Sequence, residues 1–311
     1  MRRVLAVDVG GTKFAAAVVA EDGTILTRSE RVHLGAEPDG VLADVVADVL
    51  AGPVDAIGVG TAGPLDPVRG TVSPVNIPAW RDFPLAAVVR QLTPDHPAVA
   101  IAGDAQCMAI GECWRGAAPT GRAVLGVVVS TGVGGGLILD GRPYLGPTGN
   151  AGQLGHITAD PAGPPCPCGN LGCVEVLASG PALVRHALRL GWKPEAAADG
   201  PALAAAAGRG DAAAVAAFER AGDALAVAFQ TAAAMCDLDC VVIGGGVAAA
   251  GRVLFDPIRR ALARRGGLAF ARRFDVRAGG LGRDAGLLGA ASLALAQASA
   301  DVRYPAETLS A

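Results

Sequence analysis

The sequence predicts an α/β fold with two lobes and a duplicated core, and three observations point to it. Short apolar runs alternate with segments of helical spacing along the chain. The chain has 311 residues, enough for two lobes that each bury a core of their own. Residues 4–19 (VLAVDVGGTKFAAAVV) align without a gap on residues 124–139 (VLGVVVSTGVGGGLIL), and an Asp-Gly pair follows each copy. We therefore expect an N-terminal lobe over residues 1–118 and a C-terminal lobe over 119–311, with the last helix free to pack back on the first lobe.

The first lobe opens with a strand, a glycine-rich turn and a second strand. Residues 3–9 and 13–20 have apolar β patterns, and Gly10, Gly11 and Thr12 join them. A third strand is expected after the turn at Asp22-Gly23. The remaining elements follow from periodicity: helices over 37–50, 85–92 and 105–115, and strands over 54–60 and 98–102.

The second lobe repeats this opening and then continues differently. A chance similarity between two apolar hairpins is the alternative to duplication, because apolar strands resemble one another. After the repeat comes a cysteine-rich segment. Beyond it the spacing predicts helices over 181–190, 211–236, 252–265 and 284–298, and strands over 239–243 and 274–277.

Composition excludes several classes of protein. A net charge of −3 and a pI near 5.8 argue against binding of nucleic acid through bulk charge. No apolar run reaches the roughly 20 residues that span a bilayer. Asp8 interrupts the only run that resembles a secretion signal, so we expect a cytoplasmic protein with no membrane partner. Seven cysteines in a chain of this size are expected to stay reduced there.

Three glycine-rich turns each follow an apolar strand. They are Gly10-Gly11-Thr12, Ser130 to Gly136, and Gly244-Gly245-Gly246. Such turns expose backbone N–H groups that can hold phosphate oxygens, although one such turn alone is usually only a hairpin. Neither a GxxxxGK[ST] loop nor a GxGxxG motif at a strand-to-helix junction is present. The pattern disfavours a conventional P-loop or dinucleotide fold and leaves open two phosphate hairpins with a third loop for a nucleoside.

One histidine and three cysteines gather in the segment HITADPAGPPCPCGNLGC, residues 156–173. His156, Cys166, Cys168 and Cys173 make a Cys₃His set, which matches a closed tetrahedral zinc site. A redox pair is less favoured, because Cys166 and Cys168 lack the two-residue spacing of thioredoxin-like motifs. We expect a structural zinc ion, since a closed site has no open position to activate water.

Five motifs in this order resemble those of the ROK family. They are DVGGTK (8–13), STGVGGG (130–136), NAGQLGH (150–156), CPCGNLGCVE (166–175) and IGGGV (243–247). The family comprises bacterial sugar kinases and sugar-responsive repressors with the actin-like, ribonuclease-H-like ATPase fold. The resemblance covers essentially the whole chain, and its cysteine segment is the most specific part.

The resemblance implies a nucleotide site that uses ATP and Mg²⁺. Asp8 would organise Mg²⁺, chemistry that suits a hard, hydrated cation; a turn-capping aspartate is the alternative. The residues expected to bind the phosphates are Gly10, Gly11, Thr12, Lys13, Thr131, Gly132 and Gly134. Those expected to flank the adenosine are Gly244, Gly245, Gly246 and Gly282.

The resemblance also implies a sugar site with Asp104 as the catalytic base. Asp104 lies in GDAQ, where the family has NDAN, and it would accept the proton of the sugar hydroxyl, expected to be that of O6. A helix N-cap is the structural alternative for this aspartate. In the family, the zinc-bound histidine donates its second N–H to the sugar, so His156 would link metal and substrate. Glu175 would reach the same pocket.

Two sugar-contacting positions depart from the family pattern. Gly103 replaces the first asparagine of NDAN, and Gln153 replaces the glutamate of AGExGH; Gln106 replaces the last asparagine of NDAN. Unpaired buried polar groups cost on the order of 1–3 kcal/mol, so specificity should change. We expect a hexose or an amino sugar such as kanosamine as substrate, although losing a carboxylate at position 153 suits a cationic amine poorly. Ordinary glucokinase specificity is the alternative.

Two other classes of function are weighed against an enzyme. A repressor needs a DNA-binding domain of roughly 60 to 80 residues before the first phosphate turn, and that turn begins at residue 10. A sugar sensor without turnover is the remaining alternative. The family resemblance implies a homodimer or tetramer.

Overall fold

The computed structural model describes residues 1–33 and 37–298, which form two compact units. Among these residues, the first unit consists of those within Met1–Pro119, Pro143–Ala151 and 283–298, and the second of Thr120–Arg142 and Gly152–Gly282. We expected one boundary at residue 118, with the last helix free to pack back on the first lobe; in the structure two later segments belong to the first unit, 143–151 and the one that carries the last helix. One of them, 143–151, contacts the candidate site described below.

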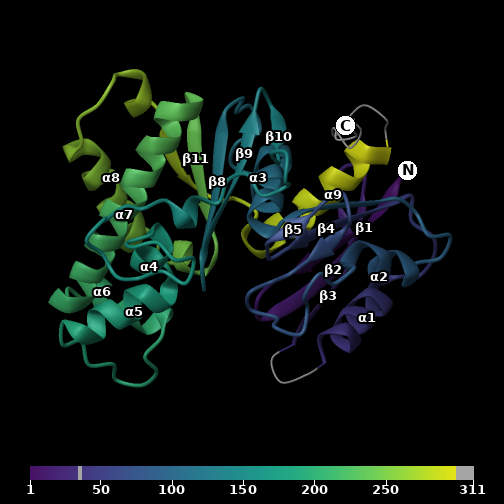
Figure 1. The fold of residues 1–311 in the computed structure, drawn as a ribbon, viewed down its shortest axis with the longest axis horizontal. Coiled ribbons are helices and arrows are strands. Elements are labelled where there is room, and N and C mark those ends of the chain that lie inside the picture. Colours follow the sequence, from purple (N-terminus) through teal and green to yellow (C-terminus); the bar gives the residue numbers. More distant parts are fainter. Residues whose placement is uncertain (34–36, 299–311) are drawn as a thin grey trace. The chain divides into compact units, whose positions relative to one another are not determined.

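The first unit is built on a five-stranded sheet with the order β3-β2-β1-β4-β7 (Figure 1). Its strands are β1 (Arg3–Val9), β2 (Lys13–Ala20), β3 (Ile25–Val32), β4 (Ala56–Thr61) and β7 (Val99–Gly103). β1 is antiparallel to β2 and parallel to β4, which is parallel to β7. These three parallel strands therefore end at one edge of the sheet. A small hairpin of β5 (Leu65–Asp66) and β6 (Thr71–Val72) follows β4.

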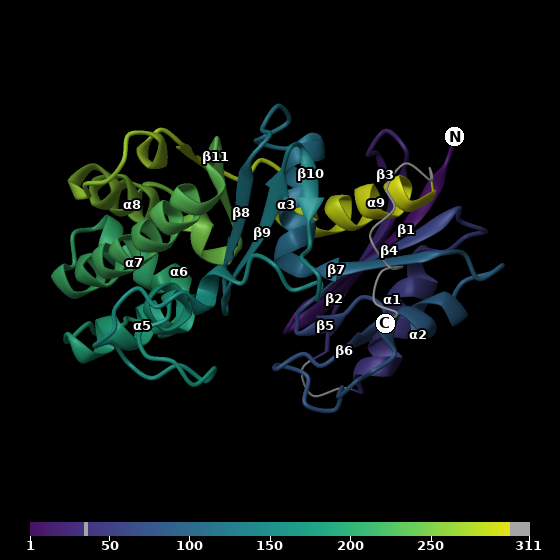
Figure 2. The same cartoon turned by 45° about the horizontal axis from the view of Figure 1, so that its top comes forward.

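Helices cover both faces of this sheet. α1 (Pro38–Val49) and α2 (Leu85–Gln91) share a core cluster with the apolar face of β1, including Leu5 and Val7. α3 (Asp104–Arg115) and α9 (Ala285–Ala298) lie side by side on the other face, as Figures 1 and 2 both show.

Glycines allow α9 to approach the sheet and α3 closely. A Cβ on Gly58 of β4 would lie 1.8 Å from the carbonyl oxygen of Ala290. On Gly289 of α9 it would lie 1.6 Å from the carbonyl oxygen of Cys107. Side chains at these positions would push the helix outward, because such contacts lie far inside van der Waals distance.

The second unit repeats the sheet topology of the first. Its sheet has the order β10-β9-β8-β11-β12, with β8 (Val124–Val129), β9 (Val133–Leu139), β10 (Arg142–Tyr144), β11 (Cys240–Gly244) and β12 (Asp275–Ala278). β8 is antiparallel to β9 and parallel to β11, which is parallel to β12. The two hairpins aligned by sequence thus occupy equivalent places, which confirms the duplicated core.

Helices and short turns complete the second unit. They are α4 (Val174–Ala178), α5 (Gly180–Arg189), α6 (Gly200–Gly208), α7 (Ala212–Cys236), α8 (Arg252–Arg264), and the 3₁₀ turns η1 (Leu154–His156), η2 (Gly246–Ala250), η3 (Phe270–Arg272) and η4 (Gly282–Asp284), the last of which runs on into the first unit. α7 begins at Asp211, whose carboxylate accepts the N–H of Ala214, and ends at Asp237 in the left-handed conformation. Its apolar face, including Phe218 and Phe229, is buried in the core.

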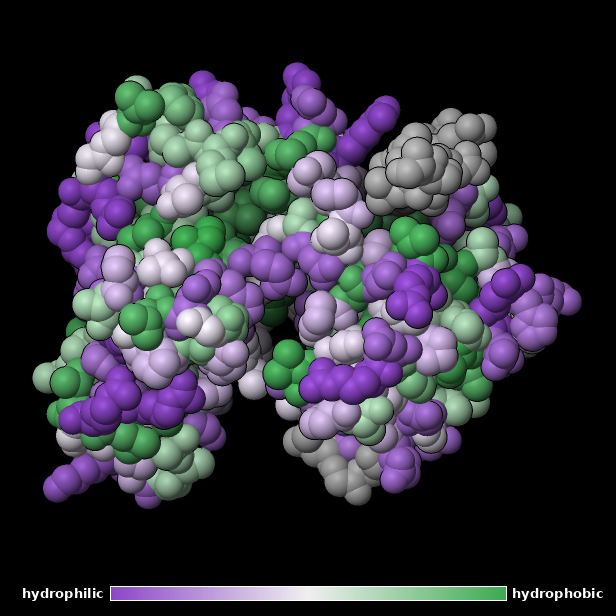
Figure 3. Space-filling model, viewed as in Figure 1, coloured by the Kyte–Doolittle hydropathy of each residue, from purple (hydrophilic) through white to green (hydrophobic). Residues whose placement is uncertain are grey.

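The surface carries both hydrophilic and hydrophobic residues, as the composition of the chain leads one to expect. Hydrophilic and hydrophobic residues are interspersed over the face drawn in Figure 3. Within residues 1–33 and 37–298, none of the helices combines the length and apolarity that a bilayer span requires.

Candidate functional site

Two aspartates lie at the carboxyl edge of the first sheet. Asp8 is the penultimate residue of β1 and pairs with Gly60 of β4. Asp104 directly follows β7, whose last residue, Gly103, pairs with Thr61. Carboxyl edges of parallel strands are the usual place for ligand sites in α/β folds. The structure thus brings together the residue expected at Mg²⁺ and the residue expected to be the base.

Asp8 lies in a tight, poorly hydrated place. Burial, and then the negative charge of Asp104, raise the pKa of Asp8 to about 7, while Lys13 and Arg28 act in the opposite direction. A Cβ on Gly286 would lie 2.7 Å from Asp8 Oδ2, so the carboxylate packs against the first turn of α9. Ionised Asp8 therefore favours a neighbouring cation.

Asp104 is the first residue of α3. Gly103 holds the N-cap position, so the structural alternative of Asp104 as the N-cap is wrong. Asp104 Oδ1 accepts the N–H of Ala105 at 2.7 Å. Burial raises the pKa of Asp104 to about 6, against the lowering effect of that N–H. The group is therefore ionised at neutral pH and still basic enough to accept a proton.

Gln106 fixes the start of α3 to the 143–151 segment. Its Oε1 accepts the N–H of Gly103 at 2.8 Å, and its Nε2 donates to the carbonyl oxygens of Gly149 (3.2 Å) and Ala151 (2.8 Å). The side chain is 5% exposed. A Cβ on Gly103 would lie 3.3 Å from Gln106 Oε1. The departures at positions 103 and 106 are therefore in direct contact.

Two asparagines near this edge were not among the predicted site residues. Asn150 exchanges hydrogen bonds with the backbone of Leu65, at 2.9 and 3.2 Å. Asn76 lies over the first glycine turn, because a Cβ on Gly11 would come 2.6 Å from its Nδ2. Asn150 stands inside a quoted family motif, which was a usable signal, whereas no motif marks Asn76.

The first glycine turn is closed by a backbone hydrogen bond from Gly10 to Lys13. Thr12, between them, accepts the N–H of His33 at 3.2 Å. Lys13 Nζ lies 2.9 Å from Glu30 Oε1 on β3, and this hydrogen bond holds the pKa of Glu30 below its usual range. In this structure, Lys13 therefore forms an ion pair with Glu30.

The other two glycine turns lie at one edge of the second sheet. Thr131 and Gly132 follow β8, Gly134 lies near the start of β9, and Gly245 and Gly246 follow β11, the parallel neighbour of β8. A Cβ on Gly245 would lie 2.5 Å from the carbonyl oxygen of Val129. Gly244 is the last residue of β11, and Gly282, with φ of 56°, follows β12 at the same edge. The predicted phosphate and adenosine residues of this unit are therefore neighbours.

The four predicted zinc ligands meet in the second unit. The ligand atoms of His156, Cys166, Cys168 and Cys173 all lie within 4.8 Å of one another. The sulfurs of Cys168 and Cys173 are 3.7 Å apart, close to the roughly 3.8 Å that tetrahedral ligands at zinc–sulfur distances would show. His156 faces Cys166 Sγ with Nδ1, at 3.8 Å, which leaves Nε2 for another partner. The donor set fits zinc.

Glycines shape the loop that carries these ligands, residues 156–173, hereafter the metal loop. Gly169 and Gly172 have φ of 97° and 57°, values that side chains rarely adopt. A Cβ on Gly172 would also lie 1.7 Å from the carbonyl oxygen of Asp160. A backbone bridge between Thr158 and Cys173 closes the loop.

The predicted sugar residues divide between the two units. Gly103 and Asp104 belong to the first unit, whereas Gln153, His156 and Glu175 belong to the second. Gln153 is exposed at the start of η1. Glu175 Oε2 accepts the N–H of Val133 at 3.0 Å, so one of its oxygens is bound to the start of β9.

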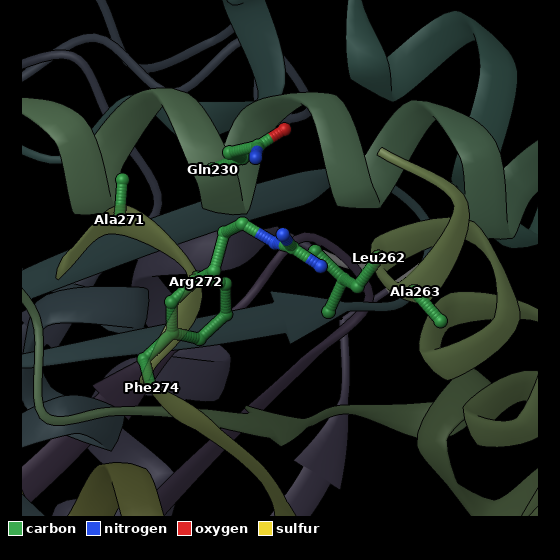
Figure 4. A pocket seen from close by; sticks show the side chains of 6 residues that line it. All are labelled: Gln230, Leu262, Ala263, Ala271, Arg272 and Phe274. Atoms are coloured by element: carbon green, nitrogen blue, oxygen red, sulfur yellow. The ribbon is translucent and has the colours of Figure 1, made fainter. Parts of the chain in front are cut away.

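A cavity of about 150 Å³ lies away from all of these residues. Its lining side chains, drawn in Figure 4, come from α7, α8 and the segment around η3, and they are Gln230, Leu262, Ala263, Ala271, Arg272 and Phe274. A second hollow of about 270 Å³ lies between α6, α7 and α8. Neither is lined by a residue that the sequence analysis singled out.

Comparisons with known proteins agree with the motifs. The profile of the ROK family matches residues 4–297. A glucokinase of Thermotoga maritima is 35% identical over 94% of this chain and 96% of its own, and an N-acetylmannosamine kinase of Escherichia fergusonii is 37% identical over 93% and 97%. The fold is similar to that of a ROK family glucokinase from Streptomyces griseus solved with glucose and AMPPNP, with a TM-score of 0.81, 33% identity, and coverage of 94% and 99%.

Proposed function

Because the chain belongs to the ROK family and has its actin-like ATPase fold, we propose that it is an ATP-dependent sugar kinase. The substrate is a hexose or amino-hexose, phosphorylated at the 6-hydroxyl. The observation that carries this proposal is the pair Asp8 and Asp104 at one sheet edge, beside the first glycine turn. The relatives named above, a glucokinase and an N-acetylmannosamine kinase, support the same chemistry.

Asp104 acts as the general base. Its Oδ1 is held by the N–H of Ala105, which orients the carboxylate and leaves Oδ2 to accept the proton of the sugar hydroxyl. The hydroxyl oxygen forms a bond to the γ-phosphorus while the bond from that phosphorus to the bridging β–γ oxygen breaks, and ADP leaves. Positioning and charge neutralisation supply most of the rate acceleration.

Asp8 and the glycine turns hold the nucleotide. Mg²⁺ fits beside Asp8, because a hard cation offsets the cost of ionising a carboxylate whose pKa is raised; when bound, it neutralises phosphate charge. The phosphates are bound by Gly10, Gly11, Thr12, Lys13, Thr131, Gly132 and Gly134. The adenosine lies against Gly244, Gly245, Gly246 and Gly282.

Zinc in the Cys₃His cluster braces the sugar-binding residues. Bound zinc would be held by His156, Cys166, Cys168 and Cys173, and a closed site supplies structure rather than water activation. Nε2 of His156, the ring nitrogen that is not the one facing Cys166 Sγ, donates to the sugar. Gln153 and Glu175 complete this side of the sugar site.

Specificity differs from that of a typical relative because of positions 103, 106 and 153. Both polar atoms of the Gln106 amide form hydrogen bonds with protein partners. The Gln106 side chain therefore does not replace the side chain that Gly103 lacks. A sugar with an altered ring substituent, such as kanosamine, suits that change. A coupled assay of ADP release over glucose, mannose, fructose, N-acetylhexosamines and kanosamine tests this, and a clear preference for glucose would exclude the amino-sugar proposal.

The same assay separates turnover from sensing. A sugar sensor of this family would bind sugars in calorimetry and release no ADP with any of them. We further propose a cytoplasmic homodimer or tetramer that binds no nucleic acid, which light scattering on a sizing column and a DNA-binding assay would check.

A further inference from the structure

The two residues that flank the metal loop, Gly155 and Glu175, both contact Val133, which directly follows the second phosphate turn, Ser130–Gly132. Both contacts converge on Val133, the first residue of β9. Its N–H donates to Glu175 Oε2 at 3.0 Å, and Glu175 is two residues beyond the ligand Cys173. A Cβ on Gly155 would lie 1.9 Å from the carbonyl oxygen of Val133, so the backbone next to the ligand His156 packs on the same residue.

The neighbours of Glu175 hold the backbone at this position in place. Cys173 is the N-cap of α4, and Glu175 lies in the first turn of this helix. Cys173 and Val174 are fully buried, and the N–H of Val174 is bonded to the carbonyl oxygen of Ile157 within the metal loop. The metal loop therefore helps to fix the backbone from which the Glu175 side chain extends.

The Glu175 carboxylate also lies against Gly132 of the turn. A Cβ on Gly132 would lie 2.6 Å from Glu175 Oε2. The N–H of Gly180, at the start of α5, donates to the carbonyl oxygen of Ser130 at 2.8 Å on the same turn. Glu175 thus bonds to the residue after a turn whose first carbonyl oxygen, that of Ser130, is also bonded.

We propose that Glu175 is a positioning residue that fixes the second phosphate turn to the metal loop, so that the bound metal preorganises this turn for the nucleotide. The proposal rests on the proposed kinase function. The N–H of Val133 already donates to Glu175, so the phosphates are bound by neighbouring N–H groups of the turn. What the turn requires from residue 175 is an acceptor oxygen of the right reach, since a negative charge beside phosphate is itself unfavourable.

Variants of Glu175 in the zinc-loaded, full-length protein test this role. Glu175→Ala removes the acceptor and should weaken Mg²⁺–AMPPNP binding, measured by calorimetry without sugar, on the order of tenfold. Glu175→Gln keeps an acceptor oxygen at the same reach and should bind as tightly as wild type or more tightly. Glu195→Ala is the matched control, because Glu195 has a side chain 86% exposed in a surface ion pair of the same unit.

Gly132→Ala should disrupt the same hydrogen bond, between Glu175 and the N–H of Val133, without changing Glu175. The added Cβ must displace Glu175 Oε2, so this variant should lose nucleotide affinity like Glu175→Ala. The double variant should be no weaker than either single variant, because both remove one interaction. Removing the metal should weaken nucleotide binding in wild type and add little in Glu175→Ala. If Glu175→Ala does not fold, Gly132→Ala and Glu175→Gln carry the test.

Zinc content and melting temperature are measured for each variant. Unchanged or tighter nucleotide binding by Glu175→Ala, with wild-type binding intact, would overturn the positioning role and leave the kinase proposal standing. Equal loss in Glu175→Gln and Glu175→Ala would also overturn it, because the acceptor would then not be what matters. Wild-type protein that binds no Mg²⁺–AMPPNP would overturn both proposals.

Discussion

Asp8 and Asp104 lie at the carboxyl edge of one parallel sheet, and the negative charge of Asp104 raises the pKa of Asp8. Burial acts on both carboxylates in the same direction, and the pKa values are about 7 and about 6. Ionising both at neutral pH is therefore unfavourable unless a cation is present.

Replacing Asp104 should abolish turnover and spare sugar binding. Asp104→Asn keeps the shape and the acceptor for Ala105 but cannot accept a proton, so kcat should fall about 10²- to 10⁴-fold. The sugar dissociation constant, from calorimetry, should change only a few-fold. Asp22→Asn, in an exposed turn of the same unit, is the control. Turnover within tenfold of wild type would show that Asp104 is not the base.

Ionisation of Asp8 should lower the stability of the folded protein as the pH rises. Its folded pKa of about 7 exceeds its ordinary value of 3.8, so the folded state binds the proton more tightly, and the free energy of unfolding falls between about pH 4 and pH 7. Asp8→Asn removes this titration and should therefore gain stability relative to wild type between pH 5 and pH 8. Urea unfolding without Mg²⁺ or nucleotide measures the gain.

Asp22 provides the control for this prediction, because its pKa is shifted in the opposite direction from that of Asp8. The N–H of Thr24 holds the pKa of Asp22 below its usual range, so Asp22→Asn should shift stability equally at pH 5 and pH 8. An Asp8→Asn variant with the pH dependence of wild type would mean that Asp8 does not carry the effect.

Gln106 should contribute to stability through all three of its hydrogen bonds. Gln106→Ala leaves the N–H of Gly103 and the carbonyl oxygens of Gly149 and Ala151 without this partner, which should cost about 2–3 kcal/mol in the free energy of unfolding. Gln106→Glu has the same shape and still accepts from Gly103, but it cannot donate, so it should also destabilise. Wild-type stability of the glutamate variant would contradict the assigned hydrogen bonds.

Metal removal should destabilise the second unit. Protein purified without chelator should carry about one zinc ion per chain by elemental analysis, held by the four ligands of the metal loop. Chelation, or Cys166→Ser, should lower the melting temperature and the affinity for sugar. Cys236→Ser, a cysteine outside the cluster, is the matched control. Full sugar affinity after verified metal loss would refute the coupling.

Much of the fold could be predicted because its signals are local. The aligned hairpins at 4–19 and 124–139 are read from alternating apolar residues and glycine turns, and both form as expected. α6 was missed because its alanine-rich sequence offers no contrast between polar and apolar faces, although Asp199 and Pro201 mark its start.

Parts of the site could not be predicted because they depend on tertiary contacts. The four metal ligands have a recognisable spacing, and they meet as expected. Nothing in the sequence links Gln106 to the carbonyl oxygen of Ala151, or Glu175 to the N–H of Val133, because these pairs are about 40 residues apart and have no periodic relation. The roles of the individual site residues remain predictions.

The return of α9 to the first sheet means that the first unit needs a segment of chain that follows the whole of the second unit. The second unit is complete once Gly282 has left the ribosome, whereas the sheet face around Gly58 stays bare until the final helix emerges. Domains usually fold from the N-terminus onward. Here the unit translated first lacks one of the helices that cover its sheet until the second unit has been made.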